Sequence, residues 1–252
     1  NRGQILKSND SLASDIKFYT HQTYPSFLFK DKSQSYVFSR IDTIVSINDT
    51  LHRIDLTFNN FNESVKTYSA EEQKTGFLNY YLKHTGNKGI NNVRGNYRLI
   101  TTNLYNNIDL MTTSNQNGIK YYFIVKPGGD MRNIQMEFTG ASSFSLNGTT
   151  NELSINSSIG SLTFDRPTVY QLTTSNTTVA VTGWTPDWTT NGASNKYKFN
   201  DGAYTSSLTL VIEVIQKTIS SITAATPPEW GTFYGGAVGY ATSHDIVTDA
   251  NG

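Results

Sequence analysis

Two tryptophans flank a short proline-containing segment, Trp184-Thr185-Pro186-Asp187-Trp188. Indole rings are flat apolar surfaces that can stack on sugar rings, and Asp187 between them adds a carboxylate that accepts hydrogen bonds. Proline restricts the backbone and stiffens the segment. These residue types predict a carbohydrate-stacking site on Trp184, Asp187 and Trp188. The alternative, which we favour, is that both rings pack over the edge of a sheet.

Histidine, the commonest general base, occurs at His21, His52, His84 and His244. No HExxH, HxH or GxSxG pattern accompanies these residues, so no local signature of a metal site or an activated serine is present. A catalytic triad assembled from distant positions remains open at this point. His52 falls on the apolar face of an alternating segment, which favours a half-buried histidine with hydrogen-bond partners.

Two aspartates stand out among the carboxylates. Asp109 follows Asn106-Asn107 at the start of a strand-like segment, where we expect it to accept backbone N–H groups across the turn rather than to hold a metal or ligand. Asp249 opens a segment that resembles the start of a calcium loop, but the other ligands of such a loop are missing, and a hairpin turn is favoured. No pair of acids suggests glycosidase chemistry. We expect no metal and no cofactor.

The charge balance argues against one large class of partners. Lys plus Arg and Asp plus Glu both number 20, giving a formal net charge of +0. Without a basic face, nucleic-acid binding is not expected. No apolar segment approaches the roughly 20 residues of a membrane span, so we expect a processed chain without one.

The composition favours sheet over helix. The chain has 252 residues, with 15 Tyr, 13 Phe and no Cys, and Asn, Ser and Thr recur throughout. Aromatic and Thr-rich segments separated by Asn/Gly turns are typical of strands. The absence of cysteine removes disulfides and thiolate sites. We predict an all-β, antiparallel β-sandwich-like fold.

Residues 97–140 give the clearest pattern. Two strand-like segments, 108–113 and 119–125, are joined through Asn117-Gly118, a pair suited to a hairpin turn. Proline and two glycines then end the second strand. Ile134, Met136 and Phe138 alternate with Gln and Glu, which predicts one face in the core. We expect consecutive antiparallel strands here.

The remaining segments are short and closely spaced, as in a sandwich or barrel. Further strands are predicted at 16–21, 26–30, 36–41, 51–58, 144–146, 152–155, 161–164, 169–173, 179–184 and 208–215. Both faces of 208–215 are apolar, which predicts a central strand. Residues 71–84 could form the only helix, although a strand is favoured. Residues 86–95 and 185–202 are predicted to be loops.

Several motifs in order carry a resemblance to a known family. The opening Asn1-Arg2-Gly3-Gln4, the strand 52–58 (HRIDLTF), the segment 104–110 (LYNNIDL), the segment 118–128 (GIKYYFIVKPG) and residues 167–171 (PTVYQ) are the ones concerned. They resemble the uncharacterised domain that precedes SBBP-type β-propeller repeats in bacterial surface proteins, many of them from Bacteroidetes. The resemblance covers most of the chain and implies no established activity.

The resemblance also organises the C-terminal part. Residues 1–218 are expected to form the N-terminal β domain, with a division into two lobes near 86–95 left open. Residues 219–228, which end in Pro227-Pro228, are predicted to be a linker. Residues 229–252 are similar to the SBBP repeat and would be an incomplete propeller repeat. The resemblance implies export by type IX secretion and an extracellular or cell-surface location.

Candidate glycosylation positions agree with that location. Asp-Ser/Thr-aliphatic triplets centred on Ser11, Thr43 and Thr50 are similar to the O-glycosylation acceptor of Bacteroidetes. The resemblance thus predicts a glycoprotein. N-x-Ser/Thr sequons also occur, but in a chain so rich in Asn, Ser and Thr most arise by chance.

Three functions follow as hypotheses. The leading one is a non-enzymatic structural or adhesion module of a larger exported protein. Its partners would be other domains of the same polypeptide, other surface proteins or glycans. The second is a carbohydrate-binding module that uses Trp184 and Trp188. A secreted hydrolase is the weakest.

Overall fold

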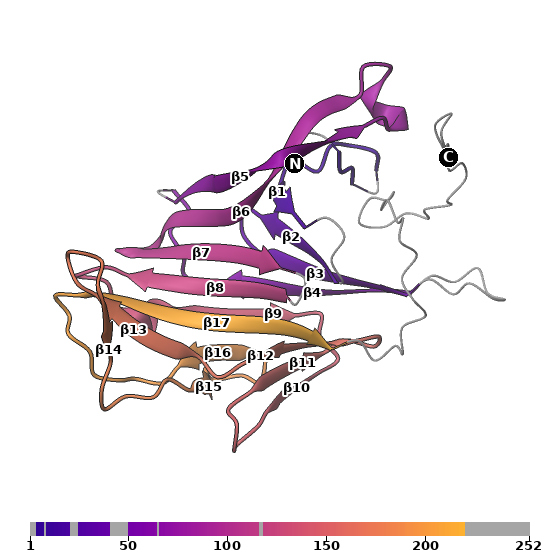
Figure 1. Ribbon diagram of the computed structural model, residues 1–252. Coiled ribbons are helices and arrows are strands. Elements are labelled where there is room, and N and C mark those ends of the chain that lie inside the picture. The colour runs from indigo at the N-terminus through magenta and orange to yellow at the C-terminus, as the bar shows by residue number, and fades with distance from the viewer. Residues whose placement is uncertain are drawn as a thin grey trace.

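The structure is a computed structural model that describes residues 4–7, 9–20, 25–40, 50–64, 66–115 and 118–219. Within these residues the chain is all-β, as the composition predicts, apart from two single 3-10 turns, η1 (Lys83–Thr85) and η2 (Met131–Asn133). The strands form two antiparallel sheets in a sandwich-like arrangement (Figure 1).

The first sheet has seven strands. Four of them come from the N-terminal quarter of the chain, and the other three come from later segments. In spatial order it contains β1 (Ile16–Tyr19), β2 (Ser26–Lys30), β3 (Gln34–Arg40), β4 (Thr50–Phe58), β9 (Gln135–Thr139), β16 (Lys196–Phe199) and β15 (Trp188–Thr190). Strands β1 to β4 are a simple meander. Strand β9 adds to β4, with Leu56 opposite Phe138.

The second sheet has ten strands. Along its main path lie β10 (Ser143–Leu146), β11 (Leu153–Asn156), β12 (Ser161–Phe164), β17 (Thr209–Ile219), β8 (Gly118–Val125), β7 (Ile108–Asn115), β6 (Ile90–Tyr105) and β5 (Thr67–Tyr80). Off this path, β13 (Thr168–Leu172) pairs with β17, and β14 (Thr178–Ala180) pairs with β13.

Strand β17 lies at the centre of this sheet. One edge pairs with β8 from Leu210↔Val125 to Lys217↔Gly118. The other edge pairs first with β13 and then with β12. Leu210, Ile212 and Val214 point to one face of the strand and belong to the core. Val211, on the opposite face, is buried as well. The central position predicted from its two apolar faces is therefore confirmed.

The hydrophobic core fills the space between the sheets with aromatic rings in edge-to-face contact. Phe123 of the second sheet lies 5.9 Å from Phe58 and 5.7 Å from Phe199, measured between ring centroids, and both partners belong to the first sheet. Phe138 of β9 lies 5.4 Å from Phe164 of β12 between ring centroids, with the two rings tilted relative to each other. Such contacts stabilise the pairing beyond simple burial of area.

The pattern in residues 97–140 is confirmed for the first three strands. Strands β6, β7 and β8 pair consecutively, and the β7–β8 hairpin closes with Asn115 opposite Gly118; Asn117 lies outside the described residues. Ile134, Met136 and Phe138 are buried, as predicted. Strand β9, however, does not pair with β8. After the turn at 127–129 the chain crosses to the first sheet.

Several boundaries differ from expectation. Residues 71–80 are strand, not helix, within β5. Residues 90–95 were predicted to be loop but begin β6, because a two-stranded ribbon exposed on both faces needs no apolar alternation. The open division into lobes near 86–95 falls at the tip of this β5–β6 hairpin, within one sheet.

The predicted loop 185–202 contains two strands, β15 and β16. Lys196-Tyr197-Lys198-Phe199 alternates charged and aromatic residues, and the two aromatic side chains are buried. This alternation is itself a strand signal that the length of the polar segment obscured. The strand predicted at 179–184 ends at Ala180 instead.

The outer half of the β5–β6 hairpin, residues 73–97, forms an arm that projects beyond the other strands of the second sheet (Figure 1). It touches the first sheet at Tyr80, whose hydroxyl accepts a hydrogen bond of 2.7 Å from the Tyr19 hydroxyl of β1. Strand β6 pairs with β7 only from Arg98 onward, so the arm is a two-stranded ribbon. Strand β5 is the edge of the second sheet.

Three predictions concern residues that the structure does not describe. The linker at 219–228 overlaps the described chain only at Ile219, the last residue of β17. The SBBP-like segment 229–252 and the candidate O-glycosylation residue Thr43 lie outside the described residues.

Candidate functional site

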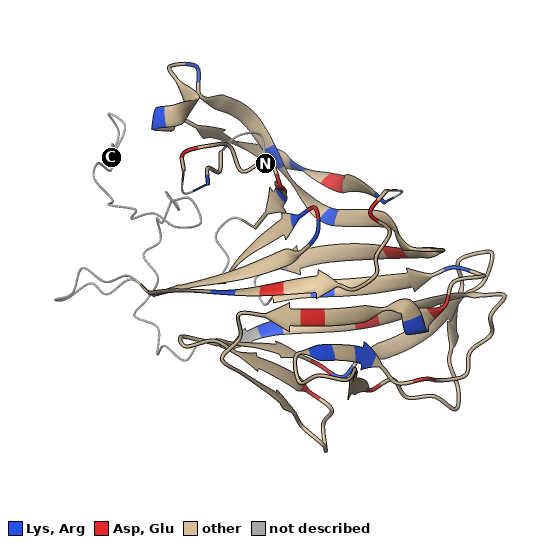
Figure 2. Cartoon of the chain, turned by 180° about the vertical axis from the view of Figure 1, so that it is seen from behind, with Lys and Arg blue, Asp and Glu red and all other residues tan. Residues whose placement is uncertain are grey.

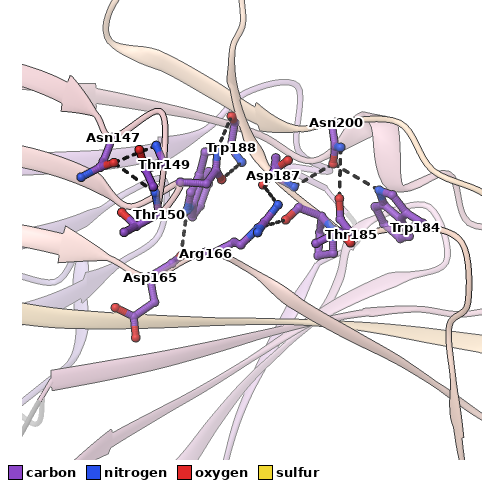
Figure 3. Close-up of polar contacts among 12 residues, drawn as sticks. Asn147, Thr149, Thr150, Asp165, Arg166, Trp184, Thr185, Asp187, Trp188 and Asn200 are labelled. Carbon is purple, nitrogen blue, oxygen red and sulfur yellow. Dashed lines mark hydrogen bonds and ion pairs between the residues drawn. The ribbon is translucent and has the colours of Figure 1, made fainter.

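The segment 184–188 is held against the sandwich by hydrogen bonds along its whole length (Figure 3). Asn200 is the centre of this network. Its side-chain oxygen accepts from the Trp184 indole N–H at 3.2 Å and from the Asp187 backbone N–H at 2.8 Å. Its side-chain nitrogen donates to the carbonyl of Thr185 at 3.2 Å. One carboxamide therefore fixes the backbone that carries both tryptophans.

Trp188 is a core residue. Its side chain is 1% exposed, its indole N–H donates to the carbonyl of Asp165 at 2.9 Å, and its ring centroid lies 5.1 Å from that of Phe199. The backbone N–H of Trp188 donates a hydrogen bond of 2.6 Å to the side-chain oxygen of Asn151. No face of this ring is free to stack on a sugar.

Trp184 is 8% exposed and packs beside Tyr204, with ring centroids 6.3 Å apart. Gly202 lies so close to the indole that a Cβ at this position would overlap the ring. The structure thus shows the packing arrangement for both rings.

Asp187 is engaged by a cation from a neighbouring segment. Its carboxylate lies 2.7 Å from a guanidinium nitrogen of Arg166, and Arg166 Nε donates to the carbonyl of Pro186 at 3.4 Å. The three residues proposed for sugar binding are therefore brought together, but as a structural unit. Asn151, Arg166 and Asn200 hold this unit in place. No sequence motif distinguishes these three residues from the many other polar residues of the chain.

Asp109 is 8% exposed and accepts a hydrogen bond of 2.9 Å from the Asn103 backbone N–H. Lys126 Nζ lies 2.5 Å from its other carboxylate oxygen. The predicted role in a turn is confirmed, and a lysine provides the positive charge. Asp249 lies outside the described residues.

His52 connects the two sheets. The Ser158 backbone N–H donates to Nδ1 at 3.1 Å, so the ring proton is on Nε2, which donates to the carbonyl of Gly140 at 2.6 Å. This is the half-buried, hydrogen-bonded histidine that the pattern predicts. His84 is exposed on the arm, and His21 and His244 lie outside the described residues.

Among the glycosylation candidates, Ser11 is exposed and its hydroxyl donates to the Asn9 side chain at 2.7 Å. Thr50 is half-buried at the start of β4. In the described ranges no cluster of three or more His, Asp or Glu residues could hold a metal ion. No helix there is long and apolar enough to cross a membrane.

A small cavity opens beside β2 and β5. Phe29, Phe58, Gln34, Lys66 and Tyr68 are among its lining residues, and its volume is about 20 Å³, enough for about one water molecule. The Lys66 ammonium lies 4.0 Å from the centroid of the Phe61 ring, and burial lowers the pKa of Lys66. The side-chain oxygen of Gln34 is buried there without a hydrogen-bond partner among the described residues, which suits a bound water.

Four of the seven large apolar side chains that are exposed in the described residues lie on the arm; the other three, Leu12, Leu51 and Val179, lie elsewhere. Phe77 is 52% exposed, Leu78 41%, Tyr81 67% and Tyr97 55%. Single exposed apolar residues are ordinary, but a group on one projecting element marks an interaction surface. Sequence reasoning missed this surface because residues 86–95 were expected to be a polar loop.

Comparison with known proteins gives one family. A family described as "Domain of unknown function (DUF7948)" matches residues 1–213. No curated protein and no solved structure matches the chain.

Proposed function

Since the chain belongs to the DUF7948 family, a domain of unknown function, its role has to be argued from its own architecture. We propose that it is a non-enzymatic structural and adhesion module of a larger exported surface protein.

The arm carries this proposal. A two-stranded ribbon with exposed Phe77, Leu78, Tyr81 and Tyr97 is marginally stable on its own and is suited to contact with another molecule. Three of the candidate reactive side chains are used within the fold: Asp109 and Asp187 form ion pairs, and His52 accepts and donates hydrogen bonds between segments.

The cellular context of the proposal comes from the resemblance to domains that precede SBBP repeats. In that context residues 1–218 would be the module and residues 229–252 the beginning of the next one. Its partners would be other domains of the same polypeptide, other surface proteins or glycans. Type IX secretion and O-glycosylation at Ser11, Thr43 and Thr50 belong to the same proposal.

Trp184 and Trp188 do not support the carbohydrate-binding alternative, because both rings are buried and hydrogen-bonded.

Surface labelling of a bacterium that encodes the chain tests the proposal. Antibodies raised against residues 1–218 should label intact cells, or detect the protein in the culture medium, while a periplasmic marker stays unlabelled. Detection only after lysis would contradict the proposal. Turnover of a glycoside or ester substrate by the purified chain would contradict its non-enzymatic part.

A further inference from the structure

The arm is positively charged throughout. Between Glu72 and Asp109 the sequence contains no Asp or Glu, whereas residues 73–97 contain Lys74, Lys83, Lys88 and Arg94. Figure 2 shows blue and no red on the outer part of this ribbon. In a chain whose formal net charge is +0, the arm therefore holds a local excess of positive charge, and the expectation that the chain has no basic face is wrong for this element.

These four cations have no ion-pair partner among the described residues, in contrast to most of those in the sandwich. Lys120 lies 2.8 Å from Glu213, Arg166 2.7 Å from Asp187 and Lys217 2.6 Å from Asp165. At the base of the arm, Glu72 is already paired with Arg98 at 3.0 Å. The outer cations are left to attract an external anion.

Aromatic rings and cations alternate along the ribbon. Lys74 Nζ lies 4.8 Å from the centroid of the Tyr97 ring, and Phe77 is directly opposite Arg94 in the strand register. Cross-strand neighbours project from the same face of a ribbon. A flat ring and a positive group are thus presented side by side.

Asparagine carboxamides lie between these groups. Asn79 and Asn87 are exposed on the arm, and the Asn79 side-chain oxygen already accepts a hydrogen bond of 2.9 Å from the Asn92 backbone N–H. Carboxamides both donate and accept hydrogen bonds, as hydroxyl groups require. The arm therefore combines stacking surfaces, cations and neutral hydrogen-bonding groups.

We infer that the arm binds an acidic polysaccharide, one whose carboxylate or sulfate groups are separated by sugar rings. The cations pair with the acidic groups, Phe77, Tyr81 and Tyr97 stack on sugar faces, and the carboxamides bond to hydroxyls. This inference rests on the proposed role outside the cell, where such polymers meet proteins.

Other occupants fit the charges and geometry less well. Arm-to-arm contact with a second copy of the chain would bring two equally positive surfaces together. A bilayer would contact apolar groups at the tip, but the tip residues 83–89 are polar and include Lys83 and Lys88. Duplex DNA favours a dense basic stripe, whereas these cations are spaced by neutral residues.

Binding of the purified chain to polygalacturonate and to chondroitin sulfate, with neutral dextran as the control polymer, tests the inference. The arm variant Lys83→Gln/Lys88→Gln/Arg94→Gln should bind about tenfold more weakly, because three charge-assisted contacts are lost. Binding by the unchanged chain should weaken with added salt, and this dependence should be shallower in the variant.

A matched variant removes the same charge elsewhere. Arg132→Gln/Lys196→Gln/Lys217→Gln changes exposed cations of the sandwich and should bind within about twofold of the unchanged chain. Phe77→Ser/Tyr81→Ser should weaken binding while keeping the salt dependence. Near-ultraviolet circular dichroism verifies that each variant is folded.

Several results would overturn the inference. These are no binding to either acidic polymer at low salt, equal loss in the arm and sandwich variants, or tighter binding to DNA or to phosphatidylglycerol vesicles than to both polysaccharides. None of these results bears on surface labelling of cells, so failure of the ligand assignment can be distinguished from failure of the proposed location.

Discussion

Tyr36 of β3 and Tyr121 of β8 meet hydroxyl to hydroxyl inside the sandwich and hydrogen-bond one sheet to the other. Both side chains are almost fully buried, at 1% and 2% exposure. A buried hydroxyl costs free energy unless it is hydrogen-bonded. Each tyrosine therefore offsets the cost of burying the hydroxyl of the other.

Replacing one member of this pair should destabilise more than replacing both. Tyr36→Phe leaves the Tyr121 hydroxyl buried without its partner and should lower the free energy of unfolding by about 1–3 kcal/mol. Adding Tyr121→Phe should recover part of that loss, because no orphaned hydroxyl remains. Urea denaturation of the two single variants and the double variant measures the coupling. Strictly additive losses would contradict it.

The buried tyrosines also predict loss of stability in alkali. Burial raises the pKa of Tyr36 and of Tyr121, and it raises the pKa of Tyr68 to about 12, whereas an unfolded tyrosine titrates near about 10. Above pH about 10 the unfolded chain therefore binds fewer protons than the folded one, and the free energy of unfolding falls as pH rises. This stabilisation is fully present below pH about 10.

Urea midpoints from pH 8 to 12 check this alkaline dependence. The Tyr68→Phe variant should show a shallower decline between pH about 10 and 12, because one group with a raised pKa is gone. An unchanged slope would show that Tyr68 is not the source.

Met136 tests the assignment of the core face of β9. Its side chain is 2% exposed, so Met136→Ala should lower the free energy of unfolding by about 2–5 kcal/mol through lost burial and a cavity. Thr139→Ala, at the exposed end of the same strand, should change it by less than about 0.5 kcal/mol. Chemical denaturation gives both values, and a loss below about 0.5 kcal/mol for Met136→Ala would show that the face is wrong.

Gly140 should not tolerate alanine. Its φ is +82°, and a Cβ there would run into the carbonyl of Arg53. The same glycine carries the carbonyl that accepts from His52 at 2.6 Å. Gly140→Ala should therefore lower the free energy of unfolding by more than about 1 kcal/mol.

Gly148 offers the matched control. It has no positive φ in the left-handed region, and no atom lies within 4 Å of a Cβ at this position, so Gly148→Ala should be neutral or slightly stabilising. Similar thermal midpoints for the two variants would contradict the strain assigned to Gly140.

Chelator and reductant should leave the thermal midpoint unchanged. The chain has no cysteine, and the Asp109 carboxylate is already neutralised by Lys126 at 2.5 Å. A clear decrease of the midpoint in EDTA would show a metal at Asp109 or Asp249, and calcium should then restore it.

Local signals predicted most strands because alternation and turn chemistry act over a few residues. Ile134, Met136 and Phe138 illustrate this, since period-two burial needs only one buried face. The sequence could not show that β9 leaves the sheet of β8 for that of β4, because this choice depends on packing between segments that are distant in sequence. The arm was missed for a related reason: Asn91 and Arg94 look like loop residues when their strand has no core to face.

The candidate site shows the same division. Residue types correctly suggested that Asp109 and His52 serve the fold, and that burial was the better prediction for Trp184 and Trp188. That Asn200, Asn151 and Arg166 hold the two tryptophans could not be foreseen, because each lies more than ten residues from at least one of its partners.

Because β17 lies at the centre of the second sheet, that sheet cannot finish folding before β17 is present. Val125 of β8 pairs with Leu210 of β17, and Phe164 of β12 pairs with Gln216 of the same strand. The edges of β8 and β12 therefore stay unpaired until β17 has been synthesised. Contacts between such distant segments form slowly, because the intervening loop must close first. A nascent chain that lacks β17 would therefore expose these two unpaired edges, and unpaired strand edges are sites of aggregation.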